Sequence, residues 1–428
     1  MKITDLKYAV LEGFPTIRIT TDCGIYGLGQ VDFYKPYLEP LFKLYKPCII
    51  GQDPTNVQRV MLRIRHLGAF KPWGSAVSAI EIALWDIAGK DAGRPTYKLL
   101  GGKVRDRVRV YMTMNVMKGP DPTPKGDKPE DYAERAKARM KLPEGFTIMK
   151  FAFPMHSHNI KPGTFYVEPP DKIPGIHPLA IALPVLPSGH MTEVGLKHSI
   201  AIVEAVKSVV GDKIGIAFDC GPRMSLAGAM QLAKALEPYN LLWLEDMLTG
   251  DYTPYNNVES YRLLSESTIV PIHTGEQVYL REGFRELLEK HAVDVIGPDP
   301  EDVGGIAELK WIAEMADLYD VLIAPHGVGN GPVGLAAVVQ VSSTLPNNFI
   351  AFEIPITKIN NPPRTIKEEE SQYKYDLYKP TKKELFNGLD NLKVVNGFIN
   401  VPDKPGLGIS LNQETVREYL GEDNKFLD

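Results

Sequence analysis

The strongest constraint on the fold is a rhythm that runs through most of the chain, in which short β-rich runs alternate with amphipathic helical stretches. Continuous Val, Ile and Leu strands that alternate with helices are typical of a parallel sheet covered by helices. Eight such runs occur after about Val108, which is the number of strands in a (β/α)8-type barrel. The runs are VRVYMTM, FTIMKFAF, KIGIAFD, LLWLED, TIVPIHTGE, AVDVIGPD, YDVLIAPH and NNFIAFE. The sequence therefore predicts an α/β barrel of the TIM type.

The residues on either side of this rhythm have other patterns. ITDLKYAVLE and PTIRITTDCGIYGLGQ predict strands around a turn, whereas residues 54–67 and 75–91 have helical spacing, and Gly93 stands where the second helix would end. The polar C-terminal tail ends in short strand-like pieces and is expected to fold back on the N-terminal part. The predicted domains are an N-terminal α+β domain of residues 1–107, completed by about 385–428, and a barrel of residues 108–384.

One connection in the predicted barrel is unusually long. Residues 154–196 lie between the second strand and its helix, are rich in Pro, Gly and His, and exceed the usual length of a barrel loop. A lid over the site and a contact between subunits explain such an insertion equally well, so both interpretations stay open.

Composition excludes several classes of protein. The 428 residues carry a formal net charge of −5 without a basic block, so nothing favours a nucleic-acid partner. Three scattered cysteines without a CxxC motif argue against a disulfide framework and for a reducing compartment. The N-terminus lacks the apolar core of a signal peptide, and no apolar run reaches membrane-spanning length. We therefore expect a cytoplasmic protein with no membrane partner.

Three consecutive predicted strands end in carboxylates, namely Asp219, Glu245 and Glu276. In a barrel of this type the C-terminal strand ends form the floor of the active site, so Glu245 is expected at this rim rather than in the core. Without nearby Arg or Lys partners the three charges would repel one another, and a divalent cation removes that cost. Oxygen ligands without Cys or His favour Mg²⁺ over Zn²⁺. One such acid alone would be a solvated strand end; three in register predict a metal site.

Other strand ends supply groups suited to acid–base chemistry. Asp299 and His326 end neighbouring strands, and a carboxylate beside an imidazole is a usual arrangement of a general base. The alternative is a histidine bound to a loop carbonyl. Glu353 would be a hydrogen-bond partner for a developing oxyanion, and Lys150 a positive charge near the substrate or metal. Asp246 is expected to point away from Glu245, because side chains alternate along a strand.

These residues and motifs resemble the enolase superfamily, and within it the mandelate racemase-like subgroup, over nearly the whole chain. SAVSAIEIALWDIAGKDAGRPTYKLLGG is similar to the family's helix that joins the capping domain to the barrel. WLED, HTGEQVY, PDPEDVGG and APHG are similar to its barrel motifs, in the expected order. The resemblance implies a modified (β/α)7β barrel with an α+β capping domain built from both termini.

The resemblance also implies a shared chemistry. The three strand-end carboxylates match the family's Mg²⁺ ligands, and Asp299 and His326 match the subgroup's Asp–His base pair. Glu353 matches its acidic residue on the last strand. The implied common step is removal of the proton α to a substrate carboxylate, followed by stabilisation of the enediolate by the metal and nearby cations.

The departures from the family pattern bear on which reaction follows. Racemase-type members carry Lys-x-Lys on the second strand, whereas here the second lysine is replaced by Ala152. A racemase needs a base on each face of the α-carbon. A good base on only one face therefore favours one-way elimination of water over racemisation. The His that in some dehydratases follows the third-strand Asp by two positions is Gly221 here, and Gly297 stands where the family often has Gln. An alternative is that the long insertion brings a Tyr or His over the site, such as Tyr166, His156 or His158. The role of Arg223 stays open.

Three functions follow from this reading. The first is a Mg²⁺-dependent hydro-lyase of carbohydrate catabolism that converts an acid sugar into a 2-keto-3-deoxy acid, and the second is a racemase, epimerase or cycloisomerase that acts on a carboxylate through the same intermediate. The third is a non-catalytic acid-binding protein. Substrate choice is expected to depend on cap loops near residues 20–26 and 67–73 and on residues 154–196. The resemblance also implies a homo-oligomer.

Overall fold

The fold was analysed in a computed structural model of the chain. The structure describes residues 1–32, 35, 38–67, 74–113, 126–156, 163–167, 189–248, 257–327, 331–355, 384–421 and 424–428.

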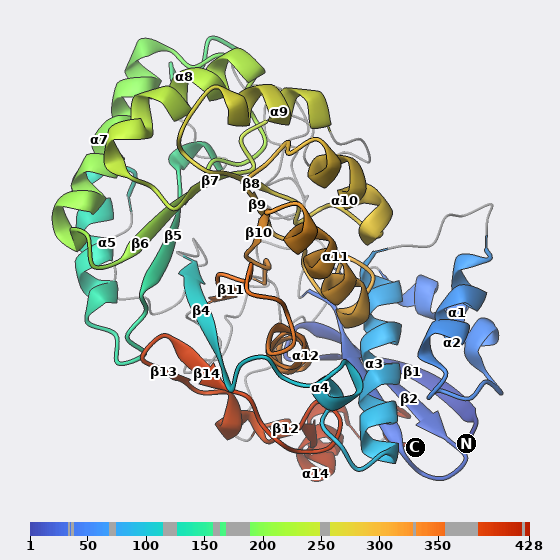
Figure 1. Ribbon diagram of the computed structural model, residues 1–428. Helices are drawn as coiled ribbons and strands as arrows, with labels where there is room; N and C mark the ends of the chain where they lie inside the picture. The colour runs from blue at the N-terminus through green and yellow to red at the C-terminus, as the bar shows by residue number, and fades with distance from the viewer. Residues whose placement is uncertain are drawn as a thin grey trace.

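A ring of parallel strands forms the centre of the molecule, with helices outside it (Figure 1). Strands β4 to β10 pair in sequence order, β11 pairs with β4, and a parallel bridge between Ile323 and Phe349 completes the ring. The strands are β4 (Arg107–Thr113), β5 (Ile148–Ala152), β6 (Gly215–Asp219), β7 (Trp243–Glu245), β8 (Ile272–Thr274), β9 (Val295–Ile296), β10 (Leu322–Ile323) and β11 (Phe352–Pro355). The predicted α/β barrel is therefore confirmed.

Each strand from β4 to β10 is followed by a helix before the next strand begins, which is the (β/α)7β order implied by the resemblance. The outer helices are α5 (Pro129–Met140), α7 (Glu193–Val210), α8 (Leu226–Leu236), α9 (Val258–Glu266), α10 (Leu280–Glu289), α11 (Ile306–Leu318) and α12 (Pro332–Ser342). Their apolar faces pack on the outside of the strands, while Tyr111 and Trp243 belong to a separate apolar cluster contributed by successive strands. The barrel is thus filled by side chains and leaves function to its rim.

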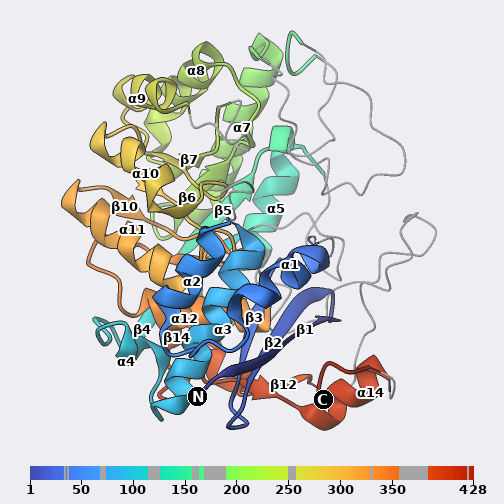
Figure 2. The same ribbon diagram turned by 90° about the vertical axis from the view of Figure 1, so that its right-hand side faces the viewer.

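The N-terminal part forms an antiparallel sheet and helices beside the barrel (Figure 2). Gly27 and Gly29 let this sheet approach α3 closely, because a Cβ at either position would lie about 2 Å from a carbonyl oxygen of that helix: 2.0 Å from Ala83 O and 1.9 Å from Ala79 O, respectively. The elements are β1 (Ile3–Leu11), β2 (Phe14–Thr21), β3 (Tyr26–Gln30), α1 (Glu39–Ile49), α2 (Val57–Arg65), α3 (Ser75–Asp91) and α4 (Thr96–Leu99).

The C-terminal tail returns to both parts of the molecule. Strand β14 (Phe398–Asn400) pairs antiparallel with β4, and Arg18 of β2 donates a hydrogen bond of 2.8 Å to the carbonyl of Leu427. Both views place the two chain ends in the lower part of the molecule, on the side of the N-terminal sheet (Figures 1 and 2). The remaining tail elements are β12 (Phe386–Asn387), β13 (Val394–Val395), β15 (Ser410–Leu411) and α14 (Gln413–Leu420).

The long insertion needs one correction. Its last four residues, 193–196, are the first turn of α7, because Thr192 caps this helix by accepting a hydrogen bond from the Gly195 N–H. The 3-10 turn Pro154–His156 follows β5 directly. Most of the rest of the insertion lies outside the described residues, as does most of the predicted cap loop 67–73, so the lid and the subunit contact stay predictions. None of the helices that the structure describes has the length and hydropathy needed to span a membrane.

A buried carboxylate joins the capping helix α3 to the barrel. Glu81 of α3 accepts hydrogen bonds from the N–H groups of Ile306 and Ala307, at 2.8 and 3.0 Å, and from the indole of Trp85. The helix N-terminus of α11 thereby receives acceptors from another domain. Gly305 makes room for this contact, since a Cβ there would lie 2.0 Å from the Glu81 carboxylate.

Replacement of Glu81 by Ala is expected to lower the free energy of unfolding by about 3 kcal/mol, because two buried backbone N–H groups and the half-buried indole of Trp85 lose their acceptor. Glu81→Gln keeps one acceptor oxygen and is expected to cost less than half as much. Urea denaturation of the two variants and the wild type measures both effects. A Glu81→Ala variant as stable as the wild type would show that this contact does not hold the domains together.

Candidate active site

The strand-end carboxylates meet at one end of the barrel. Asp219 and Glu245 are the last residues of β6 and β7 and are direct partners in the register of these strands. Glu276 follows β8 by two residues. All three side chains are almost fully buried, with Glu245 at 0% exposure. Glu245 thus ends its strand, as expected for a residue at the rim, but the expectation that it is not buried is wrong, because its side chain is completely covered.

Glu245 has a partner at each carboxylate oxygen. The ammonium of Lys150 contacts Oε1, whereas Oε2 accepts a 2.8 Å hydrogen bond from the indole of Trp243. The ring of His273 lies next to the same oxygen, with Nδ1 at 3.5 Å. Burial would raise the pKa of Glu245, but the charge and hydrogen bond of Lys150, together with His273 and His326, outweigh burial and lower this pKa to about 2. Glu245 is thus held as a carboxylate.

Lys150 on β5 stands at the centre of the acidic residues. Its Nζ is 3.0 Å from Glu353 Oε1 and 3.7 Å from Asp219 Oδ2, in addition to its contact with Glu245. Burial alone would lower the pKa of Lys150, yet the charges of Glu245 and Glu353 raise it well above the usual value. The assumption that the strand-end acids have no basic neighbour is therefore wrong, because a fully buried lysine offsets part of their charge.

Asp246 does not point away from the site. It follows the last residue of β7 and has a φ of 47°, so the alternation of strand side chains no longer applies to it. Its carboxylate accepts a 2.7 Å hydrogen bond from Thr274 Oγ1. Oxygens of Glu245, Asp246 and Glu276 lie within 4.8 Å of one another, which is an arrangement that could hold a metal ion.

Asp219 lies at the edge of this group. Its Oδ1 accepts a hydrogen bond from the Gly221 N–H at 3.0 Å, and its Oδ2 is 3.3 Å from Nε2 of His156. Burial and the charge of Glu245 raise the pKa of Asp219 well above its usual value. The set Asp219, Glu245 and Glu276 stays a prediction as a ligand set.

Asp299 and His326 are brought together at the ends of β9 and β10. His326 Nδ1 is 2.7 Å from Asp299 Oδ2, and its Nε2 lies 3.1 Å from Glu276 Oε2 and 3.4 Å from Glu353 Oε2. Burial raises the pKa of Asp299 to about 7. Burial would lower the pKa of His326, but the charges of Glu276 and Glu353 raise it well above its usual value. Asp299 fixes one ring nitrogen, and the other faces the carboxylates.

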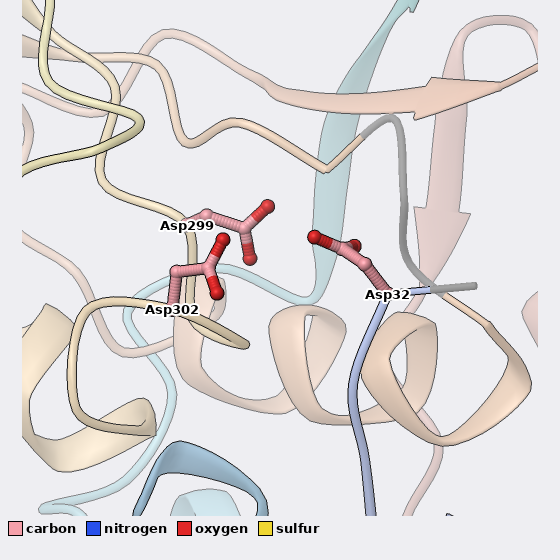
Figure 3. Close-up of side chains that lie close together, drawn as sticks. All are labelled: Asp32, Asp299 and Asp302. Carbon is pink, nitrogen blue, oxygen red and sulfur yellow. The ribbon is translucent and has the colours of Figure 1, made fainter. Parts of the chain in front are cut away.

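The capping domain places charged side chains next to Asp299. Figure 3 shows Asp32 from the N-terminal part and Asp302 from the barrel with their carboxylates directed toward that of Asp299. Lys35 offsets these charges, with Nζ 3.1 Å from Asp32 and 2.6 Å from an oxygen of Asp302. This network was not predicted, because it exists only when the two domains dock.

The structure places the other candidate residues from the sequence in different surroundings. His156 reaches Asp219, as described above, whereas Tyr166 is 72% exposed and stacks on His190. His158 lies outside the described residues. Arg223 is buried, which lowers its pKa to about 10.

Trp243 and His273 were missed as site residues. Trp243 precedes Glu245 by two positions, so strand alternation alone would have placed it on the same face. His273 carried no comparable signal, because a histidine inside a barrel strand is more often a core residue than a neighbour of a functional acid.

Comparison with known proteins matches two family descriptions to this chain. "Enolase C-terminal domain-like" covers residues 131–415, and "Mandelate racemase / muconate lactonizing enzyme, N-terminal domain" covers residues 11–101. A D-xylonate dehydratase of Haloferax volcanii is 31% identical over 100% of this chain and 91% of its own length. A D-mannonate dehydratase of Novosphingobium aromaticivorans is 28% identical over 98% and 95% of the two chains. A crystal structure of a mandelate racemase/muconate lactonizing enzyme from Sulfitobacter has a TM-score of 0.73 at 27% identity, covering 98% and 95%.

Removal of the Lys150 charge tests the charge balance of the site. In the absence of metal, Lys150→Met is expected to lower the free energy of unfolding by about 4 kcal/mol, because it leaves buried carboxylates without their cation. Excess Mg²⁺ is expected to recover part of the loss, since a cation that binds the folded state stabilises it. Urea denaturation with EDTA or with Mg²⁺ measures both effects.

Lys137→Met is the matched control, because Lys137 forms an exposed ion pair with Glu134 and its loss is expected to change stability by less than about 1 kcal/mol. Equal stability of the two methionine variants would contradict the role given to Lys150.

Proposed function

The chain belongs to the enolase superfamily, in its mandelate racemase-like subgroup, and from this premise we propose that it is a Mg²⁺-dependent dehydratase of acid sugars. The observation that carries the proposal is the meeting of two groups at one end of the barrel. Lys150 lies in β5, buried carboxylates stand at or just after the ends of β6, β7 and β8, and the Asp299–His326 pair follows β9 and β10. The relatives named D-xylonate and D-mannonate dehydratase, which match over almost the whole chain, support the substrate class.

The donor chemistry fits Mg²⁺. The converging ligand atoms are carboxylate oxygens, the hard donors that Mg²⁺ prefers. We propose that Asp219, Glu245 and Glu276 hold the ion, with Asp246 beside them. Mg²⁺ at this place supplies positive charge that stabilises the enediolate formed when a proton α to a carboxylate is lost.

The residues of the chain move the protons. Asp299 holds Nδ1 of His326, so that Nε2 is the nitrogen available to the substrate. This nitrogen takes the proton from C2 or donates the proton with which the 3-hydroxyl leaves as water. Lys150 adds positive charge beside the substrate carboxylate, and Glu353 lies next to both groups. Loss of water leaves an enol, and its proton uptake at C3 gives a 2-keto-3-deoxy acid.

A racemase or epimerase is the second candidate. Ala152, the register partner of Asp219, removes the lysine that would serve as a base on the other face. The structure nevertheless brings the imidazole of His156 to Asp219, and this ring is 26% exposed. An enzyme that returns a proton to C2 from this side would epimerise its substrate. A homo-oligomer in the cytoplasm stays part of the proposal.

Incubation with Mg²⁺ and D-xylonate, D-mannonate or D-galactonate in D₂O, followed by proton NMR, tests the reaction. We expect at least one acid to give a 2-keto-3-deoxy product. His326→Asn is expected to lower this rate by about 10³, because a positioned acid–base group contributes 10²–10⁴. His291→Asn is the matched control, since His291 is exposed at the end of α10.

Other outcomes would replace the proposal. Loss of the C2 proton signal or appearance of an epimer, without dehydration, would favour the second candidate. Binding of an acid sugar without any exchange would favour a non-catalytic protein.

The ligand set is tested by Mg²⁺ titration in a calorimeter. Asp219→Asn is expected to weaken Mg²⁺ binding about 100-fold or more, whereas Asp246→Asn, a neighbour of the ion, is expected to weaken it about 10-fold. Chelation by EDTA is expected to abolish turnover, and Mg²⁺ to restore it. The reverse order of the two variants would assign the site to Glu245, Asp246 and Glu276.

A further inference from the structure

We propose that His273 is a positioning residue for Glu245, and that Gly297 is a glycine because the ring of His273 occupies the space that any side chain there would need. The inference deepens the proposed function and rests on its metal site, since Glu245 is one of the proposed ligands.

His273 and Trp243 form a stacked pair next to the Glu245 carboxylate. The two rings lie 5.2 Å apart at an angle of 20°, and both are almost fully buried. The indole donates a hydrogen bond to Oε2 of Glu245, and His273 Nδ1 is 3.5 Å from the same oxygen. Lys150 contacts the other oxygen. The carboxylate thus lies between a cation on one side and two rings on the other, of which the indole is its hydrogen-bond donor.

The far edge of the His273 ring crosses the neighbouring strand. His273 belongs to β8, and its Nε2 lies 3.4 Å from the carbonyl of Ala324, which follows β10. Strand β9 runs between them, and Gly297 follows this strand. The ring therefore extends over the backbone of Gly297.

Steric exclusion explains the glycine. A Cβ at position 297 would lie 2.4 Å from Cε1 and 2.5 Å from Nε2 of His273, closer than real Cβ contacts. Gly297 is not among the glycines with positive φ, so its backbone conformation suits any residue. The ring of His273, and not the backbone conformation of Gly297, excludes a side chain at this position. Positions 273 and 297 are consequently coupled, and a side chain at 297 would displace the ring from Glu245.

Asparagine at position 273 separates the two roles of the ring. Its amide places a polar atom where Nδ1 of histidine lies, but it lacks Cε1 and Nε2, the two atoms that meet a Cβ at 297. His273→Asn should therefore keep the contact with Glu245 and accept Gly297→Ala. His273→Ala removes both features.

The experiment measures Mg²⁺ affinity of the full chain by calorimetry, with the thermal midpoint of the metal-free protein as a check of folding. His273→Ala and Gly297→Ala are each expected to weaken Mg²⁺ binding about 10-fold or more, the usual effect of losing a group that orients a ligand. His273→Asn and the double variant His273→Asn with Gly297→Ala are expected to stay within about threefold of the wild type. Gly215→Ala is the matched control, since a Cβ at this barrel-strand glycine meets nothing closer than a Leu242 methyl group at 3.3 Å.

Wild-type affinity in His273→Ala would show that the ring only fills space, and wild-type affinity in Gly297→Ala would show that the two positions are not coupled; either result overturns the inference. If His273→Ala does not fold, Gly297→Ala and the double variant decide the matter. Mg²⁺ binding with the expected pattern, but without dehydration of any acid sugar, would refute the proposed function and leave the inference standing. Absence of Mg²⁺ binding in the wild type would refute both.

Discussion

A lysine buried among carboxylates sets the charge balance on which the site depends. Three acids on different strands lie within 3.7 Å of the Lys150 ammonium. Carboxylates this close would otherwise raise one another's pKa until some were neutral. Lys150 instead keeps Glu245 charged at a pKa of about 2, whereas Asp219, farther from the ammonium, is left with a raised pKa. A divalent ion, as proposed, would add the charge that one lysine does not supply, so the lysine and the ion would offset the same excess of negative charge.

The capping domain contributes to the chemistry without entering the barrel. Asp32 and Lys35 lie behind Asp299, the carboxylate that fixes the ring of His326 (Figure 3). Their charges and those of Asp302 surround a group whose burial already raises its pKa to about 7. Glu81 joins the same two domains at the start of α11. Domain docking therefore places charged groups of the cap next to the carboxylate that contacts the imidazole.

The sequence predicted the parts of this site that follow from local periodicity. Strand runs alternating with helices located the barrel, and the polar residue that ends each run located the rim. The prediction failed where contacts join residues that are far apart in the sequence or where the backbone leaves its regular conformation. Glu245 is covered completely, Asp246 turns into the site because its backbone has left the strand conformation, and the network of Lys35 needs the docked cap. Gly297 was recognised as a departure from the family, but the ring that explains it lies on another strand.

The order of strands around the barrel places the charged residues in one half of the site and the Asp299–His326 pair in the other. Lys150 in β5 and the strand-end residues Asp219 and Glu245 of β6 and β7 form the charged half of the site. Asp299 and His326 follow β9 and β10 and form the half to which the proposed function assigns proton transfer. Glu276 and Glu353 stand where the halves meet, because both approach Nε2 of His326 and Glu353 also approaches Lys150. Under the proposed function, a substrate carboxylate drawn to the charged half would present its α-carbon to His326, which Asp299 orients for elimination. The two-sided exchange of a racemase would need the imidazole of His156, on the side of Asp219, as its second base.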